Sequence, residues 1–76
     1  MMDRVIHLVC QAGRIGSVAS DQDIYQAGFS SIRVLELLLA LEEEFGIKIP
    51  DKDFITARTP KDIAALIERL REQQPA

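Results

Sequence analysis

Two adjacent serines stand where a helix is predicted to begin. Ser30 and Ser31 precede an apolar-rich run, Arg33 to Phe45, whose pattern is typical of a helix. A helix N-terminus has unpaired N–H groups and a partial positive charge, so an anion attached there is stabilised. If Ser30 is the N-cap, Phe29 and Val34 have the spacing of a hydrophobic staple, and the Ser31 hydroxyl is not needed for capping. Ser31 is then either a second capping serine, which is the simpler interpretation of the pair alone, or a residue that can carry a phosphodiester.

No other set of residues indicates catalysis or metal binding. His7 has no cysteine, serine or acid at a catalytic spacing, and Cys10, the single cysteine, allows no internal disulfide and no zinc cluster. Asp21 and Asp23 lack the further ligands of a calcium loop and are typical of turns. Because no nucleophile, base and orienting group can be assembled, we expect no enzyme activity and no metal.

Length and composition indicate one small globular domain over residues 1–76. The chain is 47% hydrophobic and 28% charged, which is typical of a folded, soluble protein. No apolar run approaches the roughly 20 residues of a membrane span, and the N-terminus lacks a signal pattern, so we expect a cytoplasmic protein. A net charge of −3 without a basic stripe argues against nucleic acid as a partner.

Hydrophobic periodicity predicts an all-α fold, a small four-helix bundle with three main helices and a short third one. The predicted helices cover about residues 2–13, 31–45, 51–57 and 60–71, with a loop over 16–29. Gly13 and Gly16 are expected to break the first helix, and Gly46 to end the second. Thr59 as N-cap and Pro60 at the first helical position open the last helix. Residues 72–76 are expected to fray.

The second predicted helix has two apolar stripes. One stripe suffices for a core face and comprises Val34, Leu38, Leu41 and Phe45, with Leu37 on its flank. The other lies on a different side and comprises Ile32, Leu35 and Leu39, with Glu36, Glu42 and Glu43 on or beside it. The second stripe either widens the core contact, covers the short third helix, or forms a docking patch rimmed by acids.

The sequence around the serines resembles the acyl carrier protein family. The similar segments are Gly28-Phe29-Ser30-Ser31-Ile32, Glu36-Leu37, Ala40-Leu41-Glu42-Glu43-Glu44-Phe45 and Ile49-Pro50-Asp51, and the similarity extends from the first helix to about Leu70. In that family the serine of a Gly-x-Asp-Ser-Leu motif carries 4′-phosphopantetheine, which comes from coenzyme A. Matched residue by residue, the resemblance implies that Ser31 is modified. Ser30 replaces the aspartate of fatty-acid-type carriers, and Arg33 stands at a commonly acidic position, which indicates a specialised member.

The resemblance implies a monomeric carrier that holds acyl intermediates as thioesters for enzymes of fatty-acid, lipid or polyketide-type biosynthesis. Its expected partners are a phosphopantetheinyl transferase and acyl-loading, elongating or acyl-transfer enzymes. The implied docking residues are those of the second stripe and its rim: Ile32, Leu35, Glu36, Leu39, Glu42 and Glu43. Two alternatives stay open. One is an aminoacyl or peptidyl carrier, and the other is an unmodified helical module that binds partners through the same helix.

Overall fold

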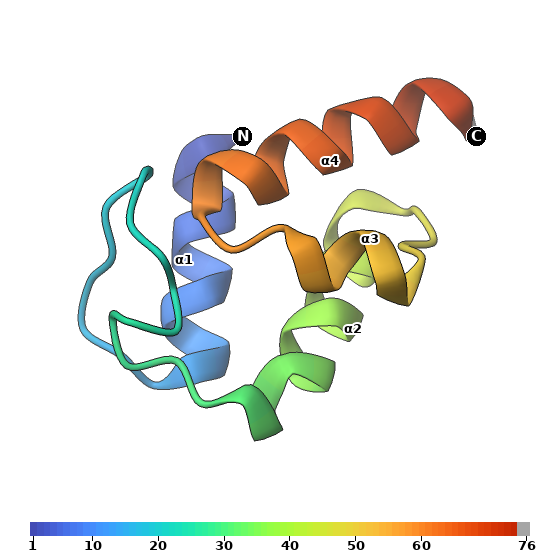
Figure 1. The fold of residues 1–76 in the computed structure, drawn as a ribbon. Helices are drawn as coiled ribbons and strands as arrows, with labels where there is room; N and C mark the ends of the chain where they lie inside the picture. The colour runs from blue at the N-terminus through green and yellow to red at the C-terminus, as the bar shows by residue number, and fades with distance from the viewer. Residues whose placement is uncertain (75–76) are drawn as a thin grey trace.

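Four α-helices and one 3₁₀ turn make up the part of the chain that the computed structural model describes, residues 1–74 (Figure 1). In chain order they are α1 (Met2–Gly13), the 3₁₀ turn η1 (Ser31–Arg33), α2 (Val34–Phe45), α3 (Asp51–Thr56) and α4 (Pro60–Gln73). No strand occurs among these residues. The predicted all-α architecture with a short third helix is confirmed.

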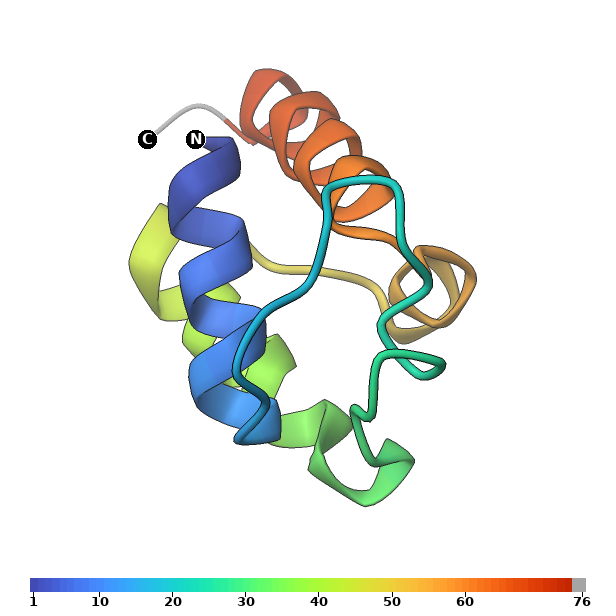
Figure 2. The same cartoon turned by 90° about the vertical axis from the view of Figure 1, so that its left-hand side faces the viewer.

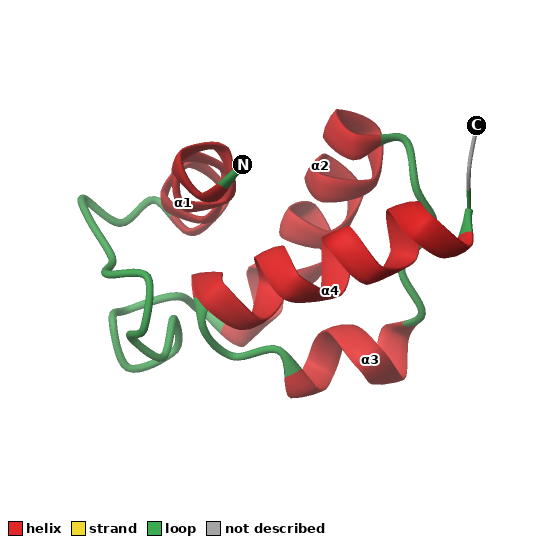
Figure 3. Cartoon of the chain, turned by 90° about the horizontal axis from the view of Figure 1, so that it is seen from above, coloured by secondary structure: helices red, strands yellow, loops and turns green. Residues whose placement is uncertain are grey.

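The helices assemble around an aliphatic core. α1 packs against both α2 and α4, and α3 packs against α4. Seen from above, α1 is viewed nearly end-on while α4 runs across the view, so these two helices cross steeply (Figure 3). The most deeply buried aliphatic side chains come from α1, α2, α4 and the first long connection: Val5, Val9, Ile24, Leu37, Leu41, Ile63 and Ile67. Within residues 1–74 no polar or charged side chain is buried.

Two predicted helix boundaries are set by local sequence signals and are confirmed. Gly46 follows α2 in the left-handed conformation, with φ 64°, and donates its N–H to the carbonyl of Glu42. Thr59 caps α4, because its hydroxyl accepts the N–H of Asp62 at 3.0 Å, and Pro60 is the first helical residue.

The predicted end of the first helix at Gly13 is confirmed, because α1 ends at this residue and Arg14 follows it as the C-cap. Arg14 takes the left-handed conformation itself, with φ 55°. Gly13 is buried because the Phe29 ring packs against it. A Cβ placed on it would overlap Cδ2 of Phe29 and lie 2.9 Å from Cε2 of the same ring. Glycine is needed at this position for close approach of an aromatic side chain.

The expected fraying of the C-terminal segment is wrong for residues 72–74. Glu72 and Gln73 belong to α4. The Gln74 side chain accepts the N–H of Lys48 and donates to the carbonyl of the same residue, both at 2.9 Å. These two bonds fasten the end of α4 to the connection between α2 and α3. Residues 75–76 lie outside the described part of the chain.

The long connection between α1 and η1 is folded onto the rest of the protein. It rises from the end of α1 to the start of α4 and then descends to the start of α2 (Figure 2). Val18, Ile24 and Phe29 of this connection are buried in the core. Lys61 donates its N–H to the carbonyl of Ser20 at 2.8 Å, which fixes the upper end of the connection against α4. Among the described residues no helix is both long and apolar enough to cross a membrane.

Candidate functional site

Ser31 is the first residue of η1, directly before α2, and it is exposed. None of the side-chain hydrogen bonds found within residues 1–74 involves its hydroxyl. The hydroxyl is therefore accessible at the start of a helical segment, where the main-chain N–H groups favour an attached anion. This position fits a serine that bears a phosphodiester.

The predicted capping role of Ser30 is wrong, whereas the predicted helical segment over 31–45 is present and has a 3₁₀ turn as its first three residues. The Ser30 side chain makes no capping hydrogen bond. Its carbonyl instead accepts the N–H of Arg33 at 2.9 Å, which forms the 3₁₀ turn, and the α-helix begins only at Val34. Because the main chain already satisfies this N–H, the Ser30 hydroxyl has no capping function here.

The segment that leads to Ser31 is anchored by Phe29. This side chain is 3% exposed, and its ring packs on Gly13 and meets the Tyr25 ring edge-on, with centroids 6.0 Å apart. Gly28, at φ 110°, lies in a region that suits glycine and turns the chain into this position. The anchor fixes the backbone two residues before Ser31.

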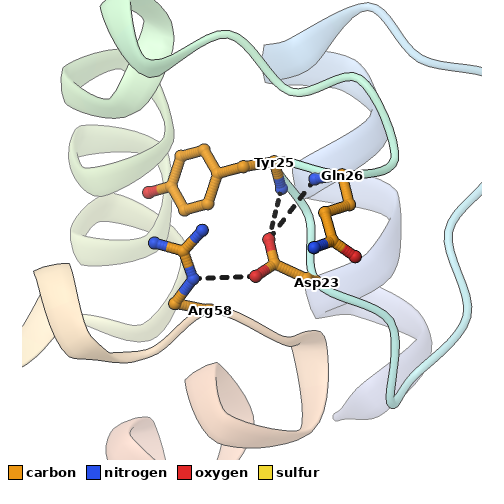
Figure 4. Close-up of polar contacts among 4 residues, drawn as sticks. All are labelled: Asp23, Tyr25, Gln26 and Arg58. Carbon is orange, nitrogen blue, oxygen red and sulfur yellow. Dashed lines mark hydrogen bonds and ion pairs between the residues drawn. The ribbon is translucent and has the colours of Figure 1, made fainter.

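A polar cluster joins the same connection to the chain after α3 (Figure 4). One Asp23 carboxylate oxygen accepts the N–H groups of Tyr25, at 2.8 Å, and Gln26, at 3.4 Å. The other carboxylate oxygen accepts a hydrogen bond from Nε of Arg58 at 2.7 Å. The Arg58 guanidinium lies 4.7 Å from the centre of the Tyr25 ring. The hydrogen bond from Arg58 holds the pKa of Asp23 below its ordinary value, assisted by the two backbone donors and opposed by partial desolvation. The predicted turn role of Asp23 is confirmed, whereas the contribution of Arg58 was not predicted.

The second stripe of α2 and η1 lies on the surface. Ile32, Leu35 and Leu39 are 87%, 62% and 54% exposed, so they do not widen the core contact. Ile55 of α3 is also exposed, at 63%, and a crevice of about 230 Å³ separates it from Leu35. The crevice has Val34, Leu38, Asp51 and Phe54 as its other lining residues. We call Ile32, Leu35, Leu39 and Ile55 the apolar patch. Ile55 was not predicted, because six residues of helix are too few to reveal two faces by periodicity.

The acids near the apolar patch differ in exposure and in whether their carboxylates already bind another residue. Glu36 is exposed and lies 3.6 Å from the guanidinium of Arg33. Glu42 is half-buried, and its carboxylate accepts the N–H of Ile49 at 2.8 Å. Glu44 pairs with Arg4 at 3.0 Å, so it fastens α2 to α1, and this hydrogen bond lowers the Glu44 pKa. Glu43 is exposed. The exposed acids on this side of α2 are thus Glu36 and Glu43.

Comparison with known proteins identifies the family. Residues 3–67 match the family described as "Phosphopantetheine attachment site". A 59-residue segment is 36% identical to the meromycolate extension acyl carrier protein of Mycolicibacterium aurum, covering 78% of this chain and 56% of that protein. A 51-residue segment is 41% identical to the acyl carrier protein of Campylobacter hominis, covering 67% of this chain and 65% of that protein.

A third relative is the acyl carrier protein of Bdellovibrio bacteriovorus, 40% identical over 42 residues, or 55% of this chain and 54% of that protein. The chain thus spans little more than half the length of the Mycolicibacterium and Bdellovibrio relatives. The family match itself extends from α1 to α4 and includes the exposed serine at the start of η1. The chain therefore belongs to the acyl carrier protein family, the phosphopantetheine attachment-site proteins.

Proposed function

We propose that Ser31 carries 4′-phosphopantetheine and that the chain holds acyl intermediates as thioesters on this arm for enzymes of fatty-acid, lipid or polyketide-type biosynthesis. One observation carries the proposal: an exposed serine stands at the start of η1, inside the segment that matches a phosphopantetheine attachment-site family. When bound, the arm supplies a terminal thiol, which forms the thioester. A flexible tether of this kind presents one cargo to several active sites at high effective concentration.

The chain supplies the oxygen of the phosphodiester but not the base. Ser31 is flanked by Ser30, Ile32 and Arg33, none of which is a general base at neutral pH. We therefore assign removal of the hydroxyl proton to the partner transferase, which transfers the arm by breaking the pyrophosphate of coenzyme A and releases the nucleotide portion. The chain acts as substrate in this step, and the later acyl chemistry belongs to the acyl-loading, elongating or acyl-transfer enzymes that it meets.

Partner enzymes are proposed to dock on the apolar patch beside Ser31. Exposed aliphatic side chains gathered on one face are typical of an interaction surface. Glu36 and Glu43 border this face and favour partners with basic contact surfaces, because complementary charge accelerates encounter. The predicted contact from Glu42 has less support, since its carboxylate already holds the N–H of Ile49.

Cargo remains a choice between two classes. Relatives named acyl carrier protein favour an acyl group. The serine at position 30 and Arg33, which lies 3.6 Å from Glu36, leave room for an aminoacyl or peptidyl cargo. Both classes use the same arm on Ser31, so the attachment test below applies to both.

Attachment is tested by intact-mass measurement after incubation with coenzyme A and a broad-specificity phosphopantetheinyl transferase. The wild type should gain one phosphopantetheine, Ser31→Ala should gain none, and Ser30→Ala should gain one. Because Ser30 makes no capping bond, Ser30→Ala should also keep wild-type stability within about 0.5 kcal/mol. Modification of Ser31→Ala would overturn the assignment. A wild type that stays unmodified would favour a helical interaction module without an arm.

A further inference from the structure

The connection that leads to Ser31 is fastened to the chain after α3 through one residue, Arg58. Its side chain donates to Asp23 at 2.7 Å and lies over the Tyr25 ring (Figure 4). Its carbonyl accepts the N–H of Ile24 at 2.8 Å. Side chain and main chain of Arg58 therefore both bind the same short stretch of the connection.

Successive main-chain hydrogen bonds link that stretch, which begins at Asp23, to Phe29, two residues before Ser31. The Asp23 carbonyl accepts the N–H of Ala27 at 3.1 Å, and the Ile24 carbonyl accepts the N–H of Phe29 at 3.0 Å. Residues 23–29 thus form one hydrogen-bonded turn that ends at the buried Phe29. Only Ser30 separates this anchor from Ser31.

The contacts of Arg58 also affect the position of α3. Arg58 directly follows Ala57, the C-cap residue after α3. α3 has six residues, and three of them, Asp51, Phe54 and Ile55, line the crevice opposite Leu35. Because so short a helix has little stability of its own, its position depends on the segments attached to its ends. Arg58 is one of these attachments.

We propose that Arg58 is a positioning residue, which holds Ser31 and the α3 side of the apolar patch in the relative arrangement that a partner enzyme binds. The functional half of this inference rests on the proposed modification of Ser31. Arg58 and Asp23 have side chains 53% and 21% exposed. Exposed ion pairs contribute little to global stability. Loss of Arg58 should therefore change the arrangement of the site more than the stability of the fold.

Arg58→Met tests the inference, because methionine keeps an unbranched stem but removes the charge and the donor. Arg58→Lys restores a cation, and Asp23→Asn keeps an oxygen for the Tyr25 and Gln26 N–H groups while it removes the charge that pairs with Arg58. The matched control is Arg4→Met, which removes the other short arginine–carboxylate pair, Arg4–Glu44 at 3.0 Å.

Two measurements distinguish positioning from a general structural effect. In the unmodified protein, Arg58→Met should shift the amide resonances of Ser31, Ile32 and Ile55, whereas Arg4→Met should leave them in place. With the transferase, Arg58→Met should raise KM for the carrier about threefold to tenfold with kcat within about twofold. The rise in KM follows if the competent arrangement is populated only a third to a tenth of the time, because apparent affinity falls by that fraction. Arg58→Lys should recover most of the loss, and Asp23→Asn should reproduce part of it.

Unchanged amide resonances in Arg58→Met would overturn the inference, and so would an equal rise of KM in Arg4→Met. A wild type that the transferase does not modify would overturn the proposed function instead. The amide measurement on the unmodified protein would then still decide whether Arg58 positions Ser31.

Discussion

Replacing Gly13 with alanine should displace the anchor that leads to Ser31. The added Cβ would overlap Cδ2 of Phe29 and lie 2.9 Å from Cε2, whereas ordinary contacts begin near 3.4 Å. The ring is 3% exposed and its edge is rigid, so the ring or the end of α1 must shift. Overpacking of this kind costs about 1–3 kcal/mol. The higher helix propensity of alanine returns at most about 1 kcal/mol, and less at the last residue of a helix. We expect a net loss of about 1–2 kcal/mol.

The assay is urea and thermal unfolding, followed by the rate of phosphopantetheine transfer at a temperature at which the variant is folded. A loss of 1 kcal/mol corresponds to a fall in Tm of about 4–8 °C for a domain of this size. Gly16→Ala is the matched control, because a Cβ there meets nothing within 4 Å, and it should stay within about 0.5 kcal/mol of the wild type. The double variant with Phe29→Leu should show coupling, since the smaller side chain relieves the overlap. Wild-type stability of Gly13→Ala would refute the view that close packing of Phe29 on α1 fixes the approach to Ser31.

Two further predictions concern charge. Lysine in place of Glu36 and Glu43 should slow modification by a basic transferase about tenfold at low salt, and the difference from the wild type should shrink as salt rises. Arg33→Asp should instead speed modification. Initial rates at two salt concentrations check both, and equal rates at low salt would place docking elsewhere. Stability should fall on acidification, because hydrogen bonds from Arg58 and Arg4 lower the folded-state pKa values of Asp23 and Glu44. This contribution is complete above their unfolded values of about 4 and is lost as the pH falls through the lower folded values. Asp23→Asn should therefore lose less stability than the wild type in urea unfolding between about pH 5 and 2, and equal losses would contradict the role of this carboxylate.

Features that depend on neighbours in sequence could be predicted. The end of α2 at Gly46 and the start of α4 at Thr59-Pro60 follow from backbone preferences of those residues. The two stripes of the second helix follow from side-chain periodicity, and the exposure of Ile32, Leu35 and Leu39 decides against a wider core contact.

Features that depend on distant partners could not be predicted. Gly13 ends α1 as predicted, but the packing of the Phe29 ring against it does not follow from any local pattern. The contact between Asp23 and Arg58 joins residues 35 positions apart, and no local sequence pattern predicts it. Ser30 was assigned a cap from its residue type, but the 3₁₀ turn satisfies the relevant N–H through the main chain. Ser31 could be chosen from the sequence as the candidate attachment residue, whereas the contacts that hold the segment before it could not be predicted.

The absence of buried polar side chains in residues 1–74 has a consequence for how this protein can deform. Where the helices meet in the interior they do so through apolar side chains, which can repack without breaking a buried hydrogen bond, and the polar contacts between helices, such as Arg4–Glu44, lie at the surface. Further side-chain hydrogen bonds fasten the connections, at Asp23–Arg58, Glu42–Ile49 and Lys48–Gln74. Exchange of one aliphatic core residue for another of equal volume should therefore alter mobility before it alters the fold. Loss of a single bond in a connection should instead release one end of a helix and let that helix move as a unit.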